Sequence, residues 1–167
     1  KNQKVRSADD VFDMYERSVG GNTVFLLNIP PNREGEFSSS DVKVLNEVGN
    51  RIKETYSNNL FSKAKGPKKV LDNNNKSYKL LNKEENSIVI STHQPVTINR
   101  FVIQESIQTH SERIEEHAID AWVNEAWKEI CISTNVGYKR ILRFPEVTSN
   151  KFRLRVLKSR LEPAISN

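Results

Sequence analysis

The sequence has 167 residues, of which 36% are hydrophobic and 28% charged, and its mean hydropathy is −0.64. This is enough chain for one ordinary domain, or for a small domain with an attachment. No apolar run approaches the roughly 20 residues that a membrane helix needs, so we predict no membrane partner. No signal peptide is visible, and we interpret the start at Lys1 as that of a processed product or a fragment.

The net charge of +5 is spread unevenly along the chain. Residues 1–60 contain 8 Lys and Arg against 9 Asp and Glu, whereas residues 61–167 contain 18 against 12. A basic half can indicate nucleic-acid binding. Many of these charges alternate with apolar residues, however, which is typical of the solvated face of a sheet. We therefore predict no nucleic-acid partner.

The first sixty residues predict a helix, a strand, a loop and a second helix. Ser7 is a suitable N-cap, and apolar residues follow it at helical spacing until Gly20 and Gly21 end the helix. The serines at 38–40 can cap the second helix, whose apolar stripe runs over residues 42–56. The two helices should therefore flank the segment between them.

That segment, Thr23–Gly35, contains a nearly continuous apolar run that stops at Pro30 and Pro31. A strand buried on both faces has this composition, although a buried helix could share it. The prolines favour the strand, because they cannot occupy a central ladder. We predict a buried strand followed by a stiff loop, which together form a piece of an α/β architecture.

Residues 59–69 have the composition of a linker, and beyond them the helical period gives way to a period of two. Asn124–Glu125 is the predicted turn of a hairpin, and in the last strand Arg153 and Arg155 should face away from the apolar residues. Several short strands with this spacing favour an antiparallel sandwich. The predicted strands are Ser87–Thr92, Val96–Glu105, Glu112–Val123, Ala126–Ser133, Gly137–Phe144 and Lys151–Lys158.

Two parts of the chain resemble the family 29 α-L-fucosidases. Ser18–Gly20 and Leu26–Gly35 look like the last strand of the family's (β/α)8-like catalytic barrel. The second half is similar to the discoidin-like, or galactose-binding-like, sandwich that follows that barrel. Its matching segments are Lys69–Asn74, Phe101–Glu105, Arg113–Ile114, Trp127–Ile130, Val136–Phe144 and Phe152–Val156.

The resemblance implies a mostly β chain, in which an antiparallel discoidin-like sandwich follows a helix–strand–helix remnant of a (β/α)8 barrel. Residues 1–58 would be the last β/α unit, residues 59–69 a linker and residues 70–167 the sandwich. The chain would be the C-terminal part of an enzyme that removes terminal α-L-fucosyl residues by a retaining mechanism, and the sandwich would support the barrel.

The same resemblance places both catalytic carboxylates before Lys1. The family's nucleophile is an aspartate on an earlier barrel strand, and its acid/base is a glutamate upstream of this chain. In retaining glycosidases the carboxyl groups of the nucleophile and the acid/base lie about 5 Å apart. We therefore assign no catalytic residue here and expect this chain alone to be inactive, whereas its parent should be an enzyme.

The sequence departs from the family pattern at several positions. Lys79 stands near a position that is usually tryptophan, and Thr109–Glu112 replaces a turn that usually contains glycine. His117 occupies a position where an apolar core residue is expected. These departures bear on ligand binding by the sandwich more than on its fold.

The loop after the predicted strand carries three candidate substrate-binding residues, Asn28, Asn32 and Arg33. Active sites of barrels lie at the carboxyl ends of the strands, and this loop leaves such an end. The alternative is that Asn28 caps backbone groups, while Arg33 pairs with Glu34 or with the sandwich. Both interpretations stay open at the level of the sequence.

The sandwich contains a second candidate set, Gln104, Glu105, Arg113 and Arg140. Amide, carboxylate and guanidinium groups can hydrogen-bond sugar hydroxyls. The alternative is an ion-pair cluster that braces neighbouring strands or the domain interface. In the same way, the pair Trp122 and Trp127 could form a sugar-stacking platform or belong to the core.

The three histidines and single cysteine show no metal-ligand spacing, so we predict no metal centre and no cofactor. A structural calcium ion near the start of the sandwich is an alternative, with oxygens from Asp72, Asn75 and Glu162. A plain Asx turn explains the first two equally well. We interpret Cys131 as a small buried hydrophobe.

The predicted partner is a fucosylated glycan bound through the parent enzyme, in the periplasm or outside the cell. The missing barrel portion or another chain should cover residues 1–58. Two alternatives remain at this stage. One is a stand-alone carbohydrate-binding module, and the other is a protein-interaction fragment with a basic sheet face.

Overall fold

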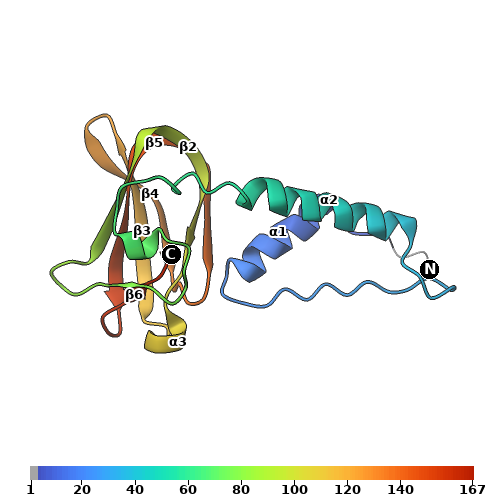
Figure 1. Cartoon of the computed structure of the whole chain (residues 1–167). Coiled ribbons are helices and arrows are strands. Elements are labelled where there is room, and N and C mark those ends of the chain that lie inside the picture. The colour runs from blue at the N-terminus through green and yellow to red at the C-terminus, as the bar shows by residue number, and fades with distance from the viewer. Residues whose placement is uncertain (1–3) are drawn as a thin grey trace. The chain divides into compact units, whose positions relative to one another are not determined.

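The computed structural model describes residues 4–167, and the chain divides into two compact units (Figure 1). One unit takes in the chain up to Val19 together with Thr23–Asn59. The other takes in Gly20–Asn22 and Leu60–Asn167. The short Gly20–Asn22 segment thus belongs to the second unit, although it lies between two parts of the first in sequence.

The first unit is built on the two predicted helices, which are confirmed. Helix α1 spans Ala8–Val19, and the Ser7 hydroxyl accepts a hydrogen bond from the N–H of Asp10 at 3.1 Å. Helix α2 spans Ser39–Tyr56 and is capped by Ser38. A small apolar core holds the helices together. Its buried members are Ala8, Val11 and Val48, and Met14, Phe25, Leu27, Val44 and Ile52 pack around them.

The strand that we predicted over the apolar run after Thr23 does not form in this chain. The segment is extended, but it has no hydrogen-bonded strand beside it among the described residues. Val24 and Leu26 are 91% and 89% exposed, whereas Phe25 and Leu27 are half-buried against the helices. A β-strand is stabilised by backbone hydrogen bonds to a neighbouring strand, and this segment has no such neighbour among the described residues.

The second unit is an antiparallel β structure, which confirms the predicted mostly β class. Its main sheet has the strand order β2-β5-β3-β4, and a two-stranded sheet pairs β1 with β6. The short helices η1 and α3 complete it. The elements are η1 (Lys68–Val70), β1 (Lys79–Leu80), β2 (Ser87–Ile103), α3 (Ile107–His110), β3 (Ile114–Val123), β4 (Ala126–Thr134), β5 (Arg140–Ser159) and β6 (Ala164–Ile165).

Strands β2 and β5 each join two of the shorter strands that we predicted. They pair with each other over most of their lengths, and the register shifts between Ser91 and Val96 and again between Ile98 and Arg100. Such irregularities bend a strand and increase its twist without ending it. The polar residues at these points therefore mark bends within continuous strands, where we predicted the ends of separate strands.

The hairpin turn and the facing of the last strand are confirmed. Asn124 and Glu125 join β3 to β4 with φ angles of 53° and 60°, as a two-residue hairpin requires. In β5 the side chain of Phe152 is 1% exposed and lies in the core, whereas Arg153 and Arg155 lie on the other face. The core of the second unit therefore follows the period of two.

Part of the segment that we interpreted as a linker packs against the sandwich core. The Phe61 ring centroid lies 5.5 Å from that of Phe101 and 5.4 Å from that of Phe152. The backbones of Lys65 and Ser91 exchange two hydrogen bonds, of 2.7 and 2.8 Å. The lysines of this segment gave it the composition of a linker, whereas its few apolar residues decide its position.

We predict that Phe61→Ala lowers the free energy of unfolding of the second unit by about 2 kcal/mol, because it removes a ring that packs on two core aromatics. Urea denaturation followed by the fluorescence of the two tryptophans, both in this unit, measures the change. The neighbouring Leu60 is 43% exposed, so Leu60→Ala serves as the control. Equal effects of the two substitutions would contradict the packing role of Phe61.

Candidate functional site

The loop after the extended segment is organised by Asn32. Its side-chain oxygen accepts hydrogen bonds from the N–H groups of Glu34 at 3.0 Å and Glu36 at 2.8 Å. Its own N–H donates to the carbonyl of Glu36 at 2.7 Å, and Gly35 turns the chain at a φ of 82°. Of the three candidates on this loop, Asn32 therefore shapes the backbone.

Asn28 and Arg33 lie exposed on the same segment. Asn28 follows the apolar run directly, and Arg33 lies within the turn that Asn32 shapes. An amide and a guanidinium group in these places can donate hydrogen bonds to a hydroxyl or a carboxylate. Two of the three candidates on this loop, Asn28 and Arg33, are therefore exposed polar groups.

In the sandwich, Glu105 is a buried structural carboxylate. One of its oxygens accepts from the N–H groups of Arg113 at 3.0 Å and Ile114 at 3.1 Å, and the other accepts from Gly137 N–H at 2.8 Å. Burial raises the pKa of Glu105, and these three hydrogen bonds oppose that shift. We call this arrangement the Glu105 corner. It joins the end of β2, the start of β3 and the loop before β5.

The other predicted members of this set do not converge on one ligand site. Gln104 donates its side-chain N–H to the carbonyl of Tyr138 at 2.9 Å, and Arg113 donates to the carbonyl of Glu162 at 2.6 Å. Arg140 donates to the Ser133 hydroxyl at 2.5 Å. The set braces the sandwich, but mainly through backbone groups and not through the ion pairs that we considered.

Two of the residues considered for calcium have side chains engaged with other protein groups. One carboxylate oxygen of Asp72 accepts from Asn74 N–H at 3.0 Å and the other from the Ser77 hydroxyl at 2.6 Å. The Asn75 side chain accepts from that of Asn167 at 3.0 Å. Within residues 4–167 no group of three or more His, Cys, Asp and Glu could hold a metal. The Asx-turn interpretation accounts for the hydrogen bond between Asp72 and Asn74, and Asn75 instead contacts the last residue of the chain.

The two tryptophans contact each other edge to face, with ring centroids 5.3 Å apart. The Lys151 ammonium lies 5.4 Å from the centroid of Trp122, and the Arg153 guanidinium lies 4.4 Å from that of Trp127. Cations therefore already occupy positions over the indole faces. This arrangement favours a self-contained cluster over an open sugar-stacking platform.

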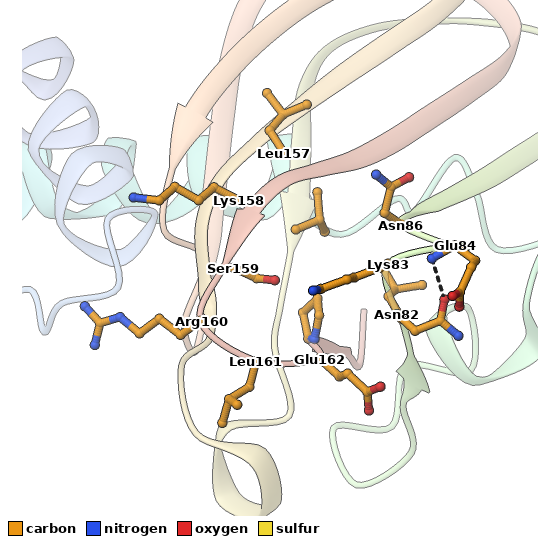
Figure 2. Close-up of a pocket in the computed structure, with 13 residues that line it drawn as sticks. Asn82, Lys83, Glu84, Asn86, Leu157, Lys158, Ser159, Arg160, Leu161 and Glu162 are labelled. Carbon is orange, nitrogen blue, oxygen red and sulfur yellow. Dashed lines mark hydrogen bonds between the residues drawn. The ribbon is translucent and has the colours of Figure 1, made fainter.

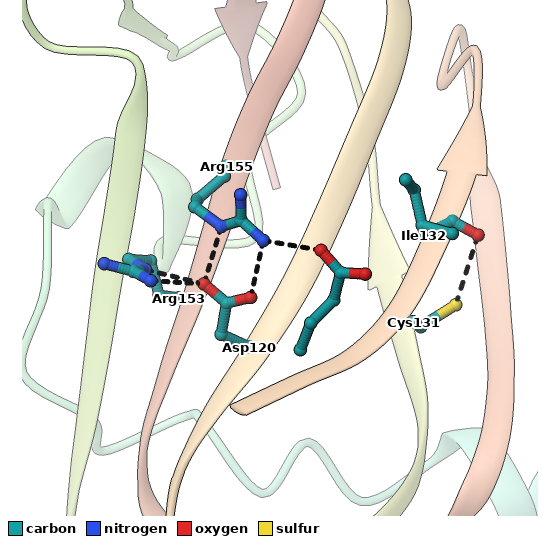
Figure 3. Close-up of polar contacts among 6 residues, drawn as sticks. Asp120, Cys131, Ile132, Arg153 and Arg155 are labelled. Carbon is teal, nitrogen blue, oxygen red and sulfur yellow. Dashed lines mark hydrogen bonds and ion pairs between the residues drawn. The ribbon is translucent and has the colours of Figure 1, made fainter. Parts of the chain in front are cut away.

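Sequence reasoning missed the charge network around Asp120, which Figure 3 shows. The Asp120 side chain is only 2% exposed and is held by Arg153 at 2.6 Å and by Arg155 at 2.7 Å. Arg155 also contacts Glu129 at 2.7 Å. Burial alone would raise the pKa of Asp120, but its hydrogen bonds with the two arginines lower it below the ordinary value. The three strands β3, β4 and β5 are thus joined on their outer face.

Cys131 lies in β4 beside this network, and its thiol is 3.8 Å from the carbonyl oxygen of Ile132 (Figure 3). The residue is half-buried, and burial raises the pKa of its thiol. A protonated thiol is a poor nucleophile and a poor metal ligand. The position therefore supports the interpretation of Cys131 as a small hydrophobic side chain.

His117, which replaces an expected core residue, is fully buried in β3. Neither ring nitrogen has a hydrogen-bond partner among the described residues. Burial, together with the positive charge of Arg140, lowers its pKa from 6.5 to about 4. The imidazole is therefore neutral at pH 7. It fills a core position as an apolar side chain would, but its two ring nitrogens are buried without hydrogen bonds to described residues.

A surface pocket of about 650 Å³ lies between the end of β5 and the segments 81–86 and 160–163 (Figure 2). Lys158 and Arg160 on its rim both pair with Glu115 at 3.1 Å. Glu162 is its only lining residue that the sequence analysis had singled out, and Glu162 uses its carbonyl to hold Arg113. The pocket therefore indicates no defined ligand.

We predict that Asp120→Asn lowers the free energy of unfolding at pH 7 by about 3 kcal/mol, because two guanidinium groups lose their shared buried carboxylate. Chemical denaturation measures the change. The exposed pairs of Glu115 with Lys158 and Arg160 offer the control Glu115→Gln, which should have a far smaller effect. A neutral result for Asp120→Asn would contradict the role of the network.

We also predict that the buried His117 costs the protein stability as the pH falls from about 6.5 to 4. The unfolded histidine binds a proton in this window and the buried His117 does not, so acid favours the unfolded state by up to about 3 kcal/mol. The lowered pKa of Asp120 adds to the loss at lower pH, because the unfolded carboxylate binds a proton there before the native one does. His117→Leu should flatten the dependence in denaturation curves at pH 7 and 4.5, whereas His93→Leu, at an exposed site, should not.

Comparison with known proteins relates the whole chain to fucosidases, although no family model matches the sequence. Alpha-L-fucosidase 1 of Arabidopsis thaliana is 33% identical over an alignment 180 positions long, which covers 96% of this chain and 35% of that protein. A relative from Oryza sativa subsp. japonica is 29% identical and is covered to the same extent. The chain spans about a third of the length of the curated relatives it matches.

Comparison with solved structures gives the same relationship to fucosidases. SpGH29 superimposes with a TM-score of 0.92 and 26% identity, over 99% of this chain and 39% of that one. A Ruminococcus gnavus GH29 fucosidase in complex with fucose has a TM-score of 0.83 and 26% identity, over 97% and 36%. CpGH89CBM32-5 from Clostridium perfringens covers 64% of this chain at 13% identity and a TM-score of 0.55, which shows the sandwich fold alone. The homologues of this chain are therefore family 29 α-L-fucosidases, and the chain corresponds to about a third of such a protein.

Proposed function

We propose that this chain is the C-terminal part of a retaining α-L-fucosidase, to which it contributes the last β/α unit of the barrel and the supporting sandwich. The similarity to fucosidases extends over both units, whereas the likeness to CpGH89CBM32-5 covers only 64% of the chain. The observation that carries the proposal is the exposure of the apolar segment after Thr23.

The exposed side chains of this segment alternate with half-buried ones. Val24 and Leu26 are about nine-tenths exposed, whereas Phe25 and Leu27 pack against the helices of the first unit. This is the pattern of a strand that is covered on one face and open on the other. Its backbone also lacks a ladder partner among the described residues. The remaining strands of a barrel would supply both the cover and the ladder.

In that setting the loop that follows would lie at the carboxyl end of a barrel strand, where such enzymes bind their substrates. Asn28 and Arg33 would donate hydrogen bonds to the sugar or to neighbouring catalytic groups, and Asn32 would hold the loop in shape. The nucleophile and the acid/base would come from the rest of the protein. The substrate would be a terminal α-L-fucosyl residue of a glycan.

A stand-alone carbohydrate-binding module is the less favoured alternative. Such a module would need an open aromatic surface, and a cation lies over one face of each of the two indole rings. It would also leave the first unit without a role. The sandwich is better explained as a support for the barrel.

The test uses Val24→Ser and Leu26→Ser in two settings. In the 167-residue chain, each should change the free energy of unfolding by less than about 0.5 kcal/mol, because these side chains are exposed. In the full-length protein each should lower it by about 2 kcal/mol and reduce hydrolysis of an aryl α-L-fucoside, because the same side chains are then buried.

Leu161→Ser, at a 63% exposed position of the second unit, is the control and should be neutral in both settings. Full-length protein that tolerates the substitutions at Val24 and Leu26 would refute the barrel-strand assignment. Fucosidase activity of the 167-residue chain by itself would refute the proposal that the catalytic carboxylates lie elsewhere.

A further inference from the structure

The segment Gly20–Asn22, which we call the strap, pairs with the start of β5. The carbonyl of Gly20 accepts from Ile141 N–H at 3.0 Å, and Asn22 N–H donates to the carbonyl of Lys139 at 3.1 Å. Gly21 lies between them and pairs with Arg140 in an antiparallel bridge. Three consecutive residues are thus held by the backbone of the second unit.

The side chain of Asn22 locks the strap in place. Its oxygen accepts from Tyr138 N–H at 2.7 Å, and its backbone has a φ of 64°. Asparagine is one of the few residues other than glycine that adopts this left-handed conformation readily. A change of residue here therefore affects both the hydrogen bond and the backbone.

Gly137 is shaped to receive this side chain. Its φ is 59°, and a Cβ atom at this position would lie 2.1 Å from the amide nitrogen of Asn22 and 2.4 Å from its Cγ. Gly137 also donates to the carboxylate of Glu105 and accepts from the backbone N–H of Glu105, both at 2.8 Å. The Glu105 corner therefore holds the receiving loop rigidly.

The chain continues from Asn22 directly into Thr23 and the apolar segment. Side chains of an extended segment alternate with a period of two, so a shift of one residue at its start exchanges the two faces. Such a shift would place Phe25 and Leu27 on the face that Val24 and Leu26 occupy, and the reverse. It would also move Asn28 to the other face. A fixed starting residue prevents this shift.

We propose that Asn22 is a positioning residue of the fucosidase, through which the sandwich sets the register of the last barrel strand and its substrate loop. This inference rests on the proposed function. It assigns to the sandwich a defined part in catalysis beyond general support. Asn22 does not touch the substrate but determines where the substrate loop begins.

The test compares variants of the full-length protein. Asn22→Gly keeps the left-handed backbone and removes the side-chain hydrogen bond, whereas Gly137→Ala places a Cβ against the Asn22 amide. Asn22→Asp keeps the acceptor oxygen and serves as the rescue variant. Asn73, which also has a positive φ of 54° in the second unit, supplies the matched control Asn73→Gly.

Asn22→Gly and Gly137→Ala should lower kcat/KM on an aryl α-L-fucoside about tenfold, and Asn22→Asp and Asn73→Gly should stay within about twofold. In Asn22→Gly and Gly137→Ala, hydrogen exchange should become at least tenfold faster at the backbone amides of residue 22, Tyr138 and Ile141. The amides of β3 should stay protected, which would show that the sandwich is still folded. Unchanged kcat/KM alongside the faster exchange would overturn the proposal.

The exchange measurement also separates this inference from the proposed function. If the full-length wild-type protein shows no fucosidase activity, the proposed function fails and the positioning role of Asn22 fails with it, even where the strap amides are protected. If the wild-type protein is active but the strap amides exchange as fast as those of exposed loops, the proposed function stands and the strap is refuted.

Discussion

The buried carboxylate of Glu105 is the interaction on which much of the second unit depends. It accepts three backbone N–H groups from two segments that are distant in sequence, and so holds the start of β3 and the loop at Gly137 against the end of β2. A buried carboxylate is unfavourable unless its oxygens are satisfied, so the arrangement is tolerated only as a whole. The strap at Gly20–Asn22 rests on the loop that this carboxylate holds.

The two units reach stability by different means. The sandwich has one apolar core, flanked on its outer face by the Asp120 network and by cations that lie over the indole rings. Among its described residues the first unit buries only Ala8, Val11 and Val48 as apolar side chains, and it leaves a ladder edge and the side chains of Val24 and Leu26 in water. That imbalance is expected of a piece that belongs to a larger sheet, and it agrees with a chain that spans about a third of its relatives' length.

Local patterns predicted the elements well where the deciding contacts are close in sequence. The caps at Ser7 and Ser38, the turn at Asn124–Glu125 and the facing of Arg153 and Arg155 all follow from spacings of a few residues. The bends within β2 and β5 resembled turns, because a register shift and a turn both interrupt an alternating pattern. The packing of Phe61 against the core was not predicted, because the lysines around it give the segment the composition of a linker.

The sequence by itself determined the mostly β class, the two helices and the resemblance to fucosidases, because these depend on periodicity and on short motifs. Only the tertiary structure decided what the polar residues do. For Glu105 and Gln104 the sequence left sugar binding and strand bracing open, and the fold places both against backbone groups. Asp120 and Gly137 attracted no site prediction, but they lie where segments distant in sequence meet. The type of a residue determines which hydrogen bonds and ion pairs its side chain can form, whereas the fold determines which partners are close enough to form them.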